Sequence, residues 1–354
     1  MADLIASVST LQSSLARRRQ HALLSQGISR AEKEVSTGLK ADIFRDLGHR
    51  SSEAVRLHNL IERNEGFISS NKLLAGRMEI TDLAMTDIRG VADDFLALAV
   101  SAANPGSAIS SELQANAQFA INRIVAQANT VYQGSYIFAG IDEDTSPLQQ
   151  WSNVNAATGL SPSDVIASIV GSGPATLADV STITADLQSV FDGTNANANY
   201  NYEATFYNGT PQAAGQRVEA RIGEGVTLSH GIQANDAGFT ELMRGLSMLV
   251  ATDISQIQDD DTYAAYLDAA VQAISKGSTM LLDAQSRLGT MQGLVDETIE
   301  QQEQVNDVYS YRILDLEGVD SYEAATRLSQ LQAQLEASFS VTARLSQLSL
   351  INFL

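Results

Sequence analysis

The sequence predicts a mainly α-helical fold, in which the N- and C-terminal parts form a long-helix coiled-coil rod bundle around a small β-rich or α/β-mixed inserted domain. Residues 57–99 carry apolar or small side chains at alternating steps of three and four, the heptad pattern of a long helix packed against partners. At about 1.5 Å per residue this helix would be about 65 Å long. Residues 267–309 keep the same alternation. Two such rods far apart in the sequence indicate a chain that runs out, builds another domain and returns to pair with itself.

The residues predicted to form the rod seam share the inward heptad positions. They are Leu57, Leu60, Phe67, Leu74, Met78, Met85, Ile88 and Phe95 in the first rod, and Leu267, Ile274, Leu281, Leu288, Met291, Val295 and Val305 in the second. Asn64 and Asn71 fall in the same register. A buried asparagine in a seam sets the register at a cost in stability, whereas one at a place where the bundle opens faces solvent. The sequence leaves both interpretations open.

Both ends of the chain carry thinner apolar stripes at helical spacing. The stripe residues are Ile5, Val8, Leu11 and Leu15 at one end, and Leu328, Leu331, Leu335, Phe339, Leu345 and Leu348 at the other. Helices with so little apolar area are marginal alone, so we expect the two ends to pair and to form the assembly interface. After Gly27 we expect a second short helix, Ile28–Ser36, before the C-cap glycine Gly38.

The composition changes near residue 140. Residues 142–234 hold four of the five prolines, the only tryptophan and many small polar residues. Tyr202–Tyr207 and Arg217–Ile222 alternate like strands, whereas Asp164–Val170 and Leu177–Phe191 fit short helices. The predicted regions are terminal helices (1–48 and 315–354), a rod bundle (49–139 and 235–314) and an outward-facing insertion (140–234). We expect the terminal helices to be disordered in the monomer and to form a coiled coil on assembly.

The composition also argues against several classes of function. The 354-residue chain has a formal net charge of -20, which disfavours general nucleic-acid binding because that needs a basic face. The charge is uneven: residues 1–50 hold eight Lys/Arg against five Asp/Glu, and residues 240–316 hold four against thirteen. Cysteine is absent, so thiol chemistry is excluded. No apolar run suits a membrane span or a secretory signal, which by itself indicates a cytoplasmic protein but leaves export without a cleaved signal open.

No catalytic or ligand-binding pattern stands out. The four histidines, His21, His49, His58 and His230, lack the spacing and glutamate of a helical zinc site. The glycine-rich segments 171–174 and 223–225 lack a P-loop lysine and fit turns. Asp259–Asp261 lacks the alternating ligands of a calcium loop and suits the start of a helix. We therefore expect a non-enzymatic protein without a cofactor or a metal.

Three segments carry a family resemblance. Glu34–Gly38 (EVSTG), Gly134–Gly140 (GSYIFAG) and the ending Glu336–Leu354 resemble the flagellin-like axial proteins of bacterial flagella. The GSYIFAG segment and the small insertion resemble the hook–filament junction members of that family more than filament flagellin. Residues 41–48 (ADIFRDLG) depart from the N-x-S-D-D-P type of segment expected there. The resemblance covers residues 1–140 and 235–354.

The resemblance implies a structural role in the flagellum. It implies a ring of self-associated subunits between hook-associated protein 1 on the hook side and flagellin on the filament side. It also implies export through the flagellar type III apparatus without a cleaved signal peptide, with an export chaperone covering the C-terminal helix beforehand. Filament flagellin itself and a cytoplasmic helical scaffold or signalling protein remain alternatives. We expect no nucleic-acid binding and no membrane insertion.

Overall fold

The computed structural model describes residues 2–103 and 109–351, with side chains described at residue 12 and at residues 14–103 and 109–344. The chain forms two compact units. Unit 1 comprises the residues up to Gly66 and those from Gln301 onward, and unit 2 comprises Phe67–Glu300. Two long helices, α3 (Ser51–Ser101) and α9 (Asp260–Glu317), contribute to both. Long helices dominate and the described strands are short, so the predicted fold class is confirmed.

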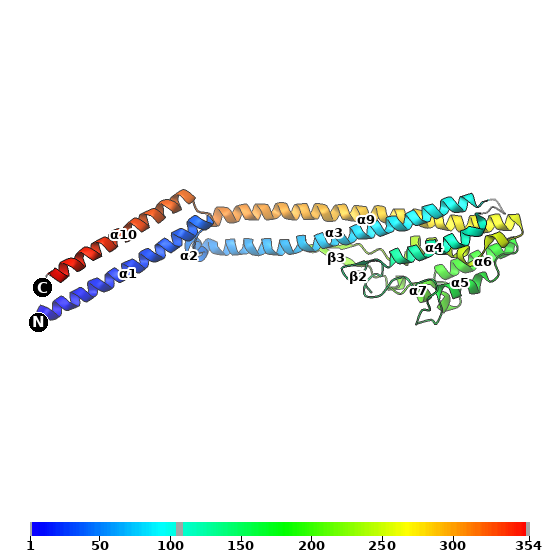
Figure 1. Ribbon diagram of the computed structural model, residues 1–354, viewed down its shortest axis with the longest axis horizontal. Helices are drawn as coiled ribbons and strands as arrows, with labels where there is room; N and C mark the ends of the chain where they lie inside the picture. The colour runs from blue at the N-terminus through cyan, green and yellow to red at the C-terminus, as the bar shows by residue number, and fades with distance from the viewer. Residues whose placement is uncertain (1, 104–108, 352–354) are drawn as a thin grey trace. The chain divides into compact units, whose positions relative to one another are not determined.

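Unit 1 is built from pairs of antiparallel helices. Helices α1 (Ala2–Thr37) and α10 (Ser321–Ile351) lie side by side (Figure 1). Helix α2 (Ile43–Leu47) and a 3-10 turn (Gly48–Arg50) lead into α3, whose first part pairs with the last part of α9.

The predicted break after Gly27 is wrong, because α1 continues through it. A β-carbon at Gly27 would lie 3.3 Å from Leu331 Cδ1. The glycine therefore allows α1 and α10 to approach closely, and this packing outweighs its weak helix propensity.

The core of unit 2 lies between α3, α4 (Ser110–Ala128), α8 (Ala237–Ala251) and α9. Its fully buried members include Met85, Ile88, Leu113, Ile121, Phe239, Leu242 and Leu246. Helices α8 and α9 pack so closely that a β-carbon at Gly277 would lie 2.6 Å from Leu242 N. Helix α9 begins at the predicted acidic run, where Asp259 Oδ2 accepts a hydrogen bond from Thr262 N at 2.9 Å.

The inserted residues contain both helices and strands. Helices α5 (Pro162–Val170) and α6 (Leu177–Phe191) each start with a capping box, and the antiparallel strands β3 (Glu219–Gly223) and β4 (Val226–Ser229) form a ribbon. A second, very short ribbon, β1 (Val131–Tyr132) with β2 (Ser135–Tyr136), precedes them. Three 3-10 turns, Ala198–Tyr200, Gln212–Ala214 and Ile254–Gln256, complete the unit.

The predicted strand at Tyr202–Tyr207 is wrong, because a helical turn, α7 (Tyr202–Thr205), stands there. Tyr202 and Phe206 stack with ring centroids 5.4 Å apart, and both contact Phe191. The apparent alternation therefore reflects aromatic residues four apart on one helical face. The apolar side chains of α5, α6 and α7 belong to the same continuous core as α3, α4 and α8, whereas Ile222 of β3 belongs to a second buried cluster with α3 and α9.

No helix in the described ranges is long and apolar enough to cross a membrane. The same ranges contain no group of three or more His, Asp or Glu side chains arranged to hold a metal ion.

Candidate assembly site

The terminal pair, defined here as α1 with α10, is held in antiparallel register by small residues and one ring contact. Gly27 faces Leu331, and the His21 ring stacks on Phe339 with centroids 4.7 Å apart. Ala31, one helical turn after Gly27 on α1, is also buried. The two ends of the chain therefore lie together, as their apolar stripes predict.

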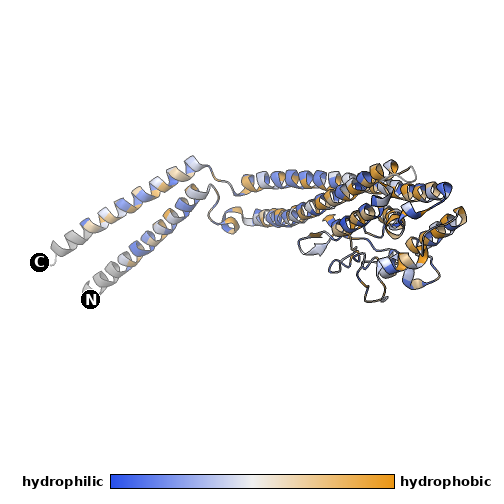
Figure 2. Ribbon diagram, turned by 45° about the vertical axis from the view of Figure 1, so that its right-hand side comes forward, coloured by the Kyte–Doolittle hydropathy of each residue, from blue (hydrophilic) through white to orange (hydrophobic). Residues whose placement is uncertain are grey.

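The terminal pair leaves much of its apolar surface uncovered. Leu328, Leu331 and Leu335 are half-buried, whereas Leu15 and Phe339 are exposed. No leucine with a described side chain in α1 or α10 is fully buried. Hydrophilic and hydrophobic residues are mixed along both helices (Figure 2). Two helices alone cannot close a core, so this surface suits the addition of further helices.

Several predicted interface side chains lie outside the described part of the chain. They are Ile5, Val8, Leu11, Leu345 and Leu348.

The chain crosses twice between the terminal pair and the α3–α9 pair of unit 1, and the two crossings are hydrogen-bonded to each other. Lys40 N donates to Glu317 O at 2.7 Å, and Val319 N donates to Gly38 O at 3.0 Å. Gly38 adopts a φ of 68°, a left-handed conformation that favours glycine. The crossings therefore form one joined element and not two independent linkers.

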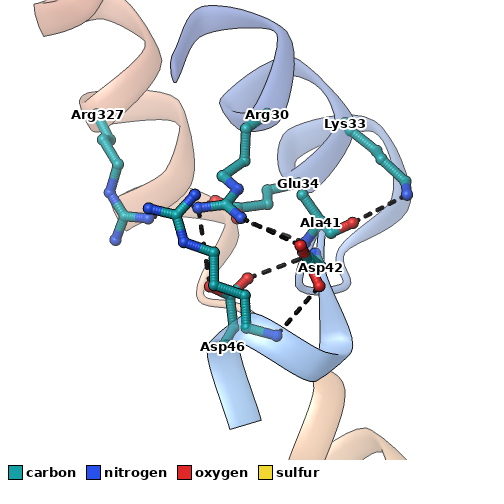
Figure 3. A network of polar contacts seen from close by, with 8 residues as sticks. Arg30, Lys33, Glu34, Ala41, Asp42, Asp46 and Arg327 are labelled. Atoms are coloured by element: carbon teal, nitrogen blue, oxygen red, sulfur yellow. Dashed lines mark hydrogen bonds and ion pairs between the residues drawn. The ribbon is translucent and has the colours of Figure 1, made fainter. Parts of the chain in front are cut away.

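A buried carboxylate, Glu34, lies at this element. Its side chain accepts hydrogen bonds from Arg327 at 3.3 Å and from Ala41 N at 3.4 Å (Figure 3). Because Glu34 opens the EVSTG segment, the contact gives that segment a physical role: it joins α1 to α10 and to the first crossing. No local sequence pattern marks Glu34 and Arg327 as partners, because they lie 293 residues apart in the chain.

The segment 41–48, which departs from the family pattern, forms the short helix α2. Asp42 caps it by accepting a hydrogen bond from Arg45 N at 3.1 Å. The Arg30 guanidinium lies 3.9 Å from Asp42 and 3.8 Å from Asp46 (Figure 3). These long, partly solvated ion pairs contribute little to stability, so the cap and the backbone bonds hold the turn.

In unit 1, α3 and α9 pair through apolar and amide contacts. Leu57 belongs to a buried cluster with Ile313 and Leu316. Asn64 Nδ2 donates to Gln302 O at 2.7 Å and to Asn306 Oδ1 at 2.9 Å. The alternative that Asn64 faces solvent is therefore wrong, since both amide donations cross the helix pair.

Asn71, in unit 2, is buried but has a different partner. Its side chain donates to Ile222 O of the β3–β4 ribbon at 2.9 Å. The Arg221 guanidinium lies 5.6 Å from the centre of the Phe67 ring, and Ile222 packs among seam residues of α3 and α9. The ribbon is thus a third member of this part of the bundle, and Asn71 attaches it.

Most of the predicted seam residues are buried. Leu57, Leu74, Met78, Met85, Ile88, Phe95, Leu267, Ile274, Leu281, Leu288 and Val295 are buried, and Leu60, Phe67 and Met291 are half-buried. Val305 does not fit the seam, because it is 37% exposed. Gln302 and Asn306, with their contacts to Asn64, occupy the inward positions on this part of α9.

The GSYIFAG segment closes the base of the insertion. Phe138 O accepts a hydrogen bond from Ala234 N at 3.0 Å, and Ala139 O accepts one from Thr210 N at 2.9 Å. Gly140 has a φ of 76°, and a β-carbon there would collide with the Thr210 side chain. The segment therefore ties the start of the insertion to its end.

The perturbed pKa values in unit 2 follow from burial and ion pairing. Burial, with the nearby Arg77 guanidinium, lowers the pKa of His230 to about 4. Burial acts to raise the pKa of Glu241, but hydrogen bonds from Lys276 and Arg244, each 2.6 Å long, lower it overall. Glu241 thereby links α8 to α9, which is a structural arrangement and not an acid–base pair.

Residues 8–143 match the bacterial flagellin N-terminal helical region, and residues 271–354 match the bacterial flagellin C-terminal helical region. The chain belongs to the flagellin family. The two matches cover α3, α4 and α10 and most of α1 and α9, which include the helices that pair the two ends of the chain. A member of this family is a structural component of the bacterial flagellum.

The fold is similar to that of a flagellar hook-associated protein from Vibrio parahaemolyticus, at 12% sequence identity and a TM-score of 0.53. The alignment covers 77% of this chain and 99% of that one. A crystal structure of Bacillus cereus FlgL aligns at 14% identity and a TM-score of 0.44, covering 76% of this chain and 98% of that one. No curated protein sequence matches the chain.

Proposed function

We propose that this flagellin-family chain is a FlgL-type hook–filament junction subunit, which forms a ring that links hook-associated protein 1 to flagellin. The observation that carries the proposal is the open terminal pair, in which no described leucine is fully buried. A subunit that joins unlike neighbours contacts them head-to-tail, with one surface toward each neighbour. It therefore needs exposed apolar surface on both of its sides. The role is mechanical and non-enzymatic.

Two features favour a junction subunit over filament flagellin. The GSYIFAG segment closes a small insertion, and it resembles the junction members of the family. The fold also resembles a protein described as flagellar and hook-associated. A cytoplasmic scaffold is not favoured, since both flagellin regions match.

The proposal includes partners and a route of export. Hook-associated protein 1 and flagellin are the neighbours, and an export chaperone covers α10 before assembly. The subunit leaves the cell through the flagellar type III apparatus without a cleaved signal peptide. The regions 1–48 and 315–354 order fully only on assembly, which suits passage of an extended chain.

The proposal is tested in cells that lack this protein. We expect flagellin to appear unassembled in the medium and hooks to carry no filament. Purified protein should not grow long filaments by itself. Filament growth from the purified protein without a cap or partner would instead identify a filament flagellin.

A truncated chain without Leu335–Leu354 separates folding from assembly. We expect it to stay soluble and helical, because its missing residues belong to unit 1 and none of those with a described side chain lies in the core of unit 2. It should not enter flagella. Collapse of the whole fold in circular dichroism would contradict the division between a folded rod and assembly-dependent ends.

A further inference from the structure

A cavity of about 340 Å³ opens in unit 2 where the first turn of α8 lies beside α9. Its floor is apolar and includes Phe239, Leu281 and Leu288, which are all buried. Met280 and Met291, both half-buried, line its two ends along α9. An engineered cavity of about 150 Å³ in another protein already binds benzene, so this one has room for a branched aliphatic side chain.

Two arginines give the cavity a basic lining. Arg217 forms an ion pair with Asp236 at 2.6 Å, and Asp236 is the one acidic side chain among the described residues that line the cavity. Arg287 is exposed and has no ion-pair or hydrogen-bond partner in the described part of the chain. The cavity therefore suits an apolar side chain that has a carboxylate beside it.

A row of three side chains on α3 has these properties, and we call it the acidic ridge. Its central residue, Leu83, is 54% exposed. Glu79 and Asp87 flank Leu83 at four residues on either side, so the three form one i±4 row on the surface of the helix. Both carboxylates are exposed, and neither has a partner among the residues that the structure describes.

Hydrogen bonds between α3 and α9 fix the register of the two helices in unit 2. Gln285 Nε2 donates to Thr86 Oγ1 at 2.9 Å, and Ser278 Oγ donates to Asp93 Oδ1 at 3.0 Å. The helices are antiparallel and the two bonds are equally far apart along both, so each residue forward on α3 corresponds to one residue back on α9.

This register places the acidic ridge level with the cavity. Leu83 is level with Leu288 of the cavity floor, and Asp87 is about three residues, or about 4.5 Å, from the level of Arg287. The flexible arginine side chain spans such an offset. In a closed ring whose rods run along its axis, neighbouring copies stand at the same height. The ridge of one copy therefore stands at the height of the cavity of the next.

The ridge and the cavity point in different directions, so they cannot meet within one subunit. Leu83 precedes the fully buried Met85 by two residues, about 200° around α3, and therefore points away from the core. Arg287 follows Gln285, which contacts α3, by two residues, and therefore points away from α3 in the same way. Each subunit thus offers the ridge on one side and the cavity on another.

We propose that the acidic ridge of one subunit inserts Leu83 into this cavity of a second copy, with Asp87 beside Arg287. The contact joins two different surfaces, so it repeats from subunit to subunit and closes into a ring when the rotation allows. This inference rests on the proposed ring and assigns its lateral contact.

Pairs of introduced cysteines test the contact and its register, because the chain has no cysteine of its own. The register places Glu79 level with Met291, and Gly90 level with Met280, to within about one residue. The matched pairs are therefore Glu79→Cys/Met291→Cys and Gly90→Cys/Met280→Cys. In cells whose only copy carries a matched pair, a short bismaleimide cross-linker added to isolated flagella should produce a ladder of dimers, trimers and larger species.

The crossed pairs are the controls, because they use the same four positions. Glu79→Cys/Met280→Cys and Gly90→Cys/Met291→Cys are about 10–12 residues out of level, or about 15–18 Å along the helices, and should give no ladder. Each single variant should stay monomeric on a denaturing gel. Equal ladders from matched and crossed pairs, or dimers from a single variant, would overturn the inference.

A charge exchange gives a second measurement that needs no cysteine. When Asp87→Arg is the only copy in the cell, the amount of this protein in isolated flagella should fall about fivefold, and adding Arg287→Asp should restore it. Both side chains are exposed, so the purified variants should unfold at the temperature of the unaltered subunit. Normal incorporation of Asp87→Arg would overturn the charge pairing.

The two proposals fail differently. If the matched pairs are present in isolated flagella but form no ladder, the lateral contact is wrong and the junction role stands. If the cysteine variants do not enter flagella, the charge exchange decides the lateral contact. If the unaltered protein is absent from isolated flagella, the proposed function itself is wrong.

Discussion

Leu331, near the middle of the terminal pair, should matter more to the assembly than to the free subunit. In the free subunit it is half-buried and packs where Gly27 lets the helices approach. Complete burial of a leucine is worth about 1.5–3 kcal/mol, and the terminal regions order fully only on assembly, so Leu331→Ala should cost the free subunit at most about 1 kcal/mol. Once further helices cover it, the same truncation should cost about 2–5 kcal/mol. The surplus of at least about 1 kcal/mol weakens each assembly contact roughly fivefold or more.

The assay compares two quantities for one variant. Thermal unfolding of the purified subunit measures the first, and competition with the unaltered protein for incorporation into flagella measures the second. Leu113→Ala, at a fully buried position of unit 2, should lower unfolding stability more than Leu331→Ala does. Gln334→Ala, at an exposed position of α10, should change neither. A Leu331→Ala variant that is as unstable as the Leu113→Ala variant but enters flagella normally would show that Leu331 is not an assembly contact.

Three further predictions concern unit 2 and the seam, each read by thermal or denaturant unfolding. Asn71→Leu should lower the free energy of unfolding by about 1–3 kcal/mol because it removes a buried hydrogen bond. Asn64→Leu should lower it by less, because Asn64 is only half-buried, and equal losses for the two variants would contradict this. His230 has a folded pKa of about 4, below its unfolded value, so stability should fall by up to about 3 kcal/mol as the pH drops from about 6.5 to 4, and His230→Gln should lack this loss. Gly277→Ala should lower the free energy of unfolding by about 1–3 kcal/mol through overpacking, because its β-carbon would lie 2.6 Å from Leu242 N. The matched control Gly289→Ala, with open space around it, should be neutral or slightly stabilising.

The burial of the seam was predictable because heptad spacing is a local property. Leu74, Ile88, Leu281 and Val295 occupy inward positions whatever their partner is, since the helical period alone places them on one face. Val305 shows the limit of this reasoning. An apolar residue in register is exposed there because Gln302 and Asn306, which accept hydrogen bonds from Asn64, take the inward positions on either side of it.

The predictions of a helix break at Gly27 and of a strand at Tyr202–Tyr207 are wrong for the same reason. In both places the local pattern competes with a contact to residues far along the chain. Packing against Leu331 stabilises a continuous helix at Gly27, and packing against Phe191 stabilises a helical turn at Tyr202. Helix propensity and polar–apolar alternation predict secondary structure poorly where packing against distant residues determines the local conformation.

The sequence by itself determined the fold class, the two rods, the pairing of the chain ends and the family, because periodicity and short motifs can be recognised within short stretches of the chain. Only the tertiary structure decided the partners of the asparagines, the buried Glu34–Arg327 contact and the outward faces of α3 and α9. These depend on which segments meet across hundreds of residues, and no local pattern carries that information. The open terminal pair belongs to both: its thin stripes are local, but their incomplete burial appears only once the two helices lie together.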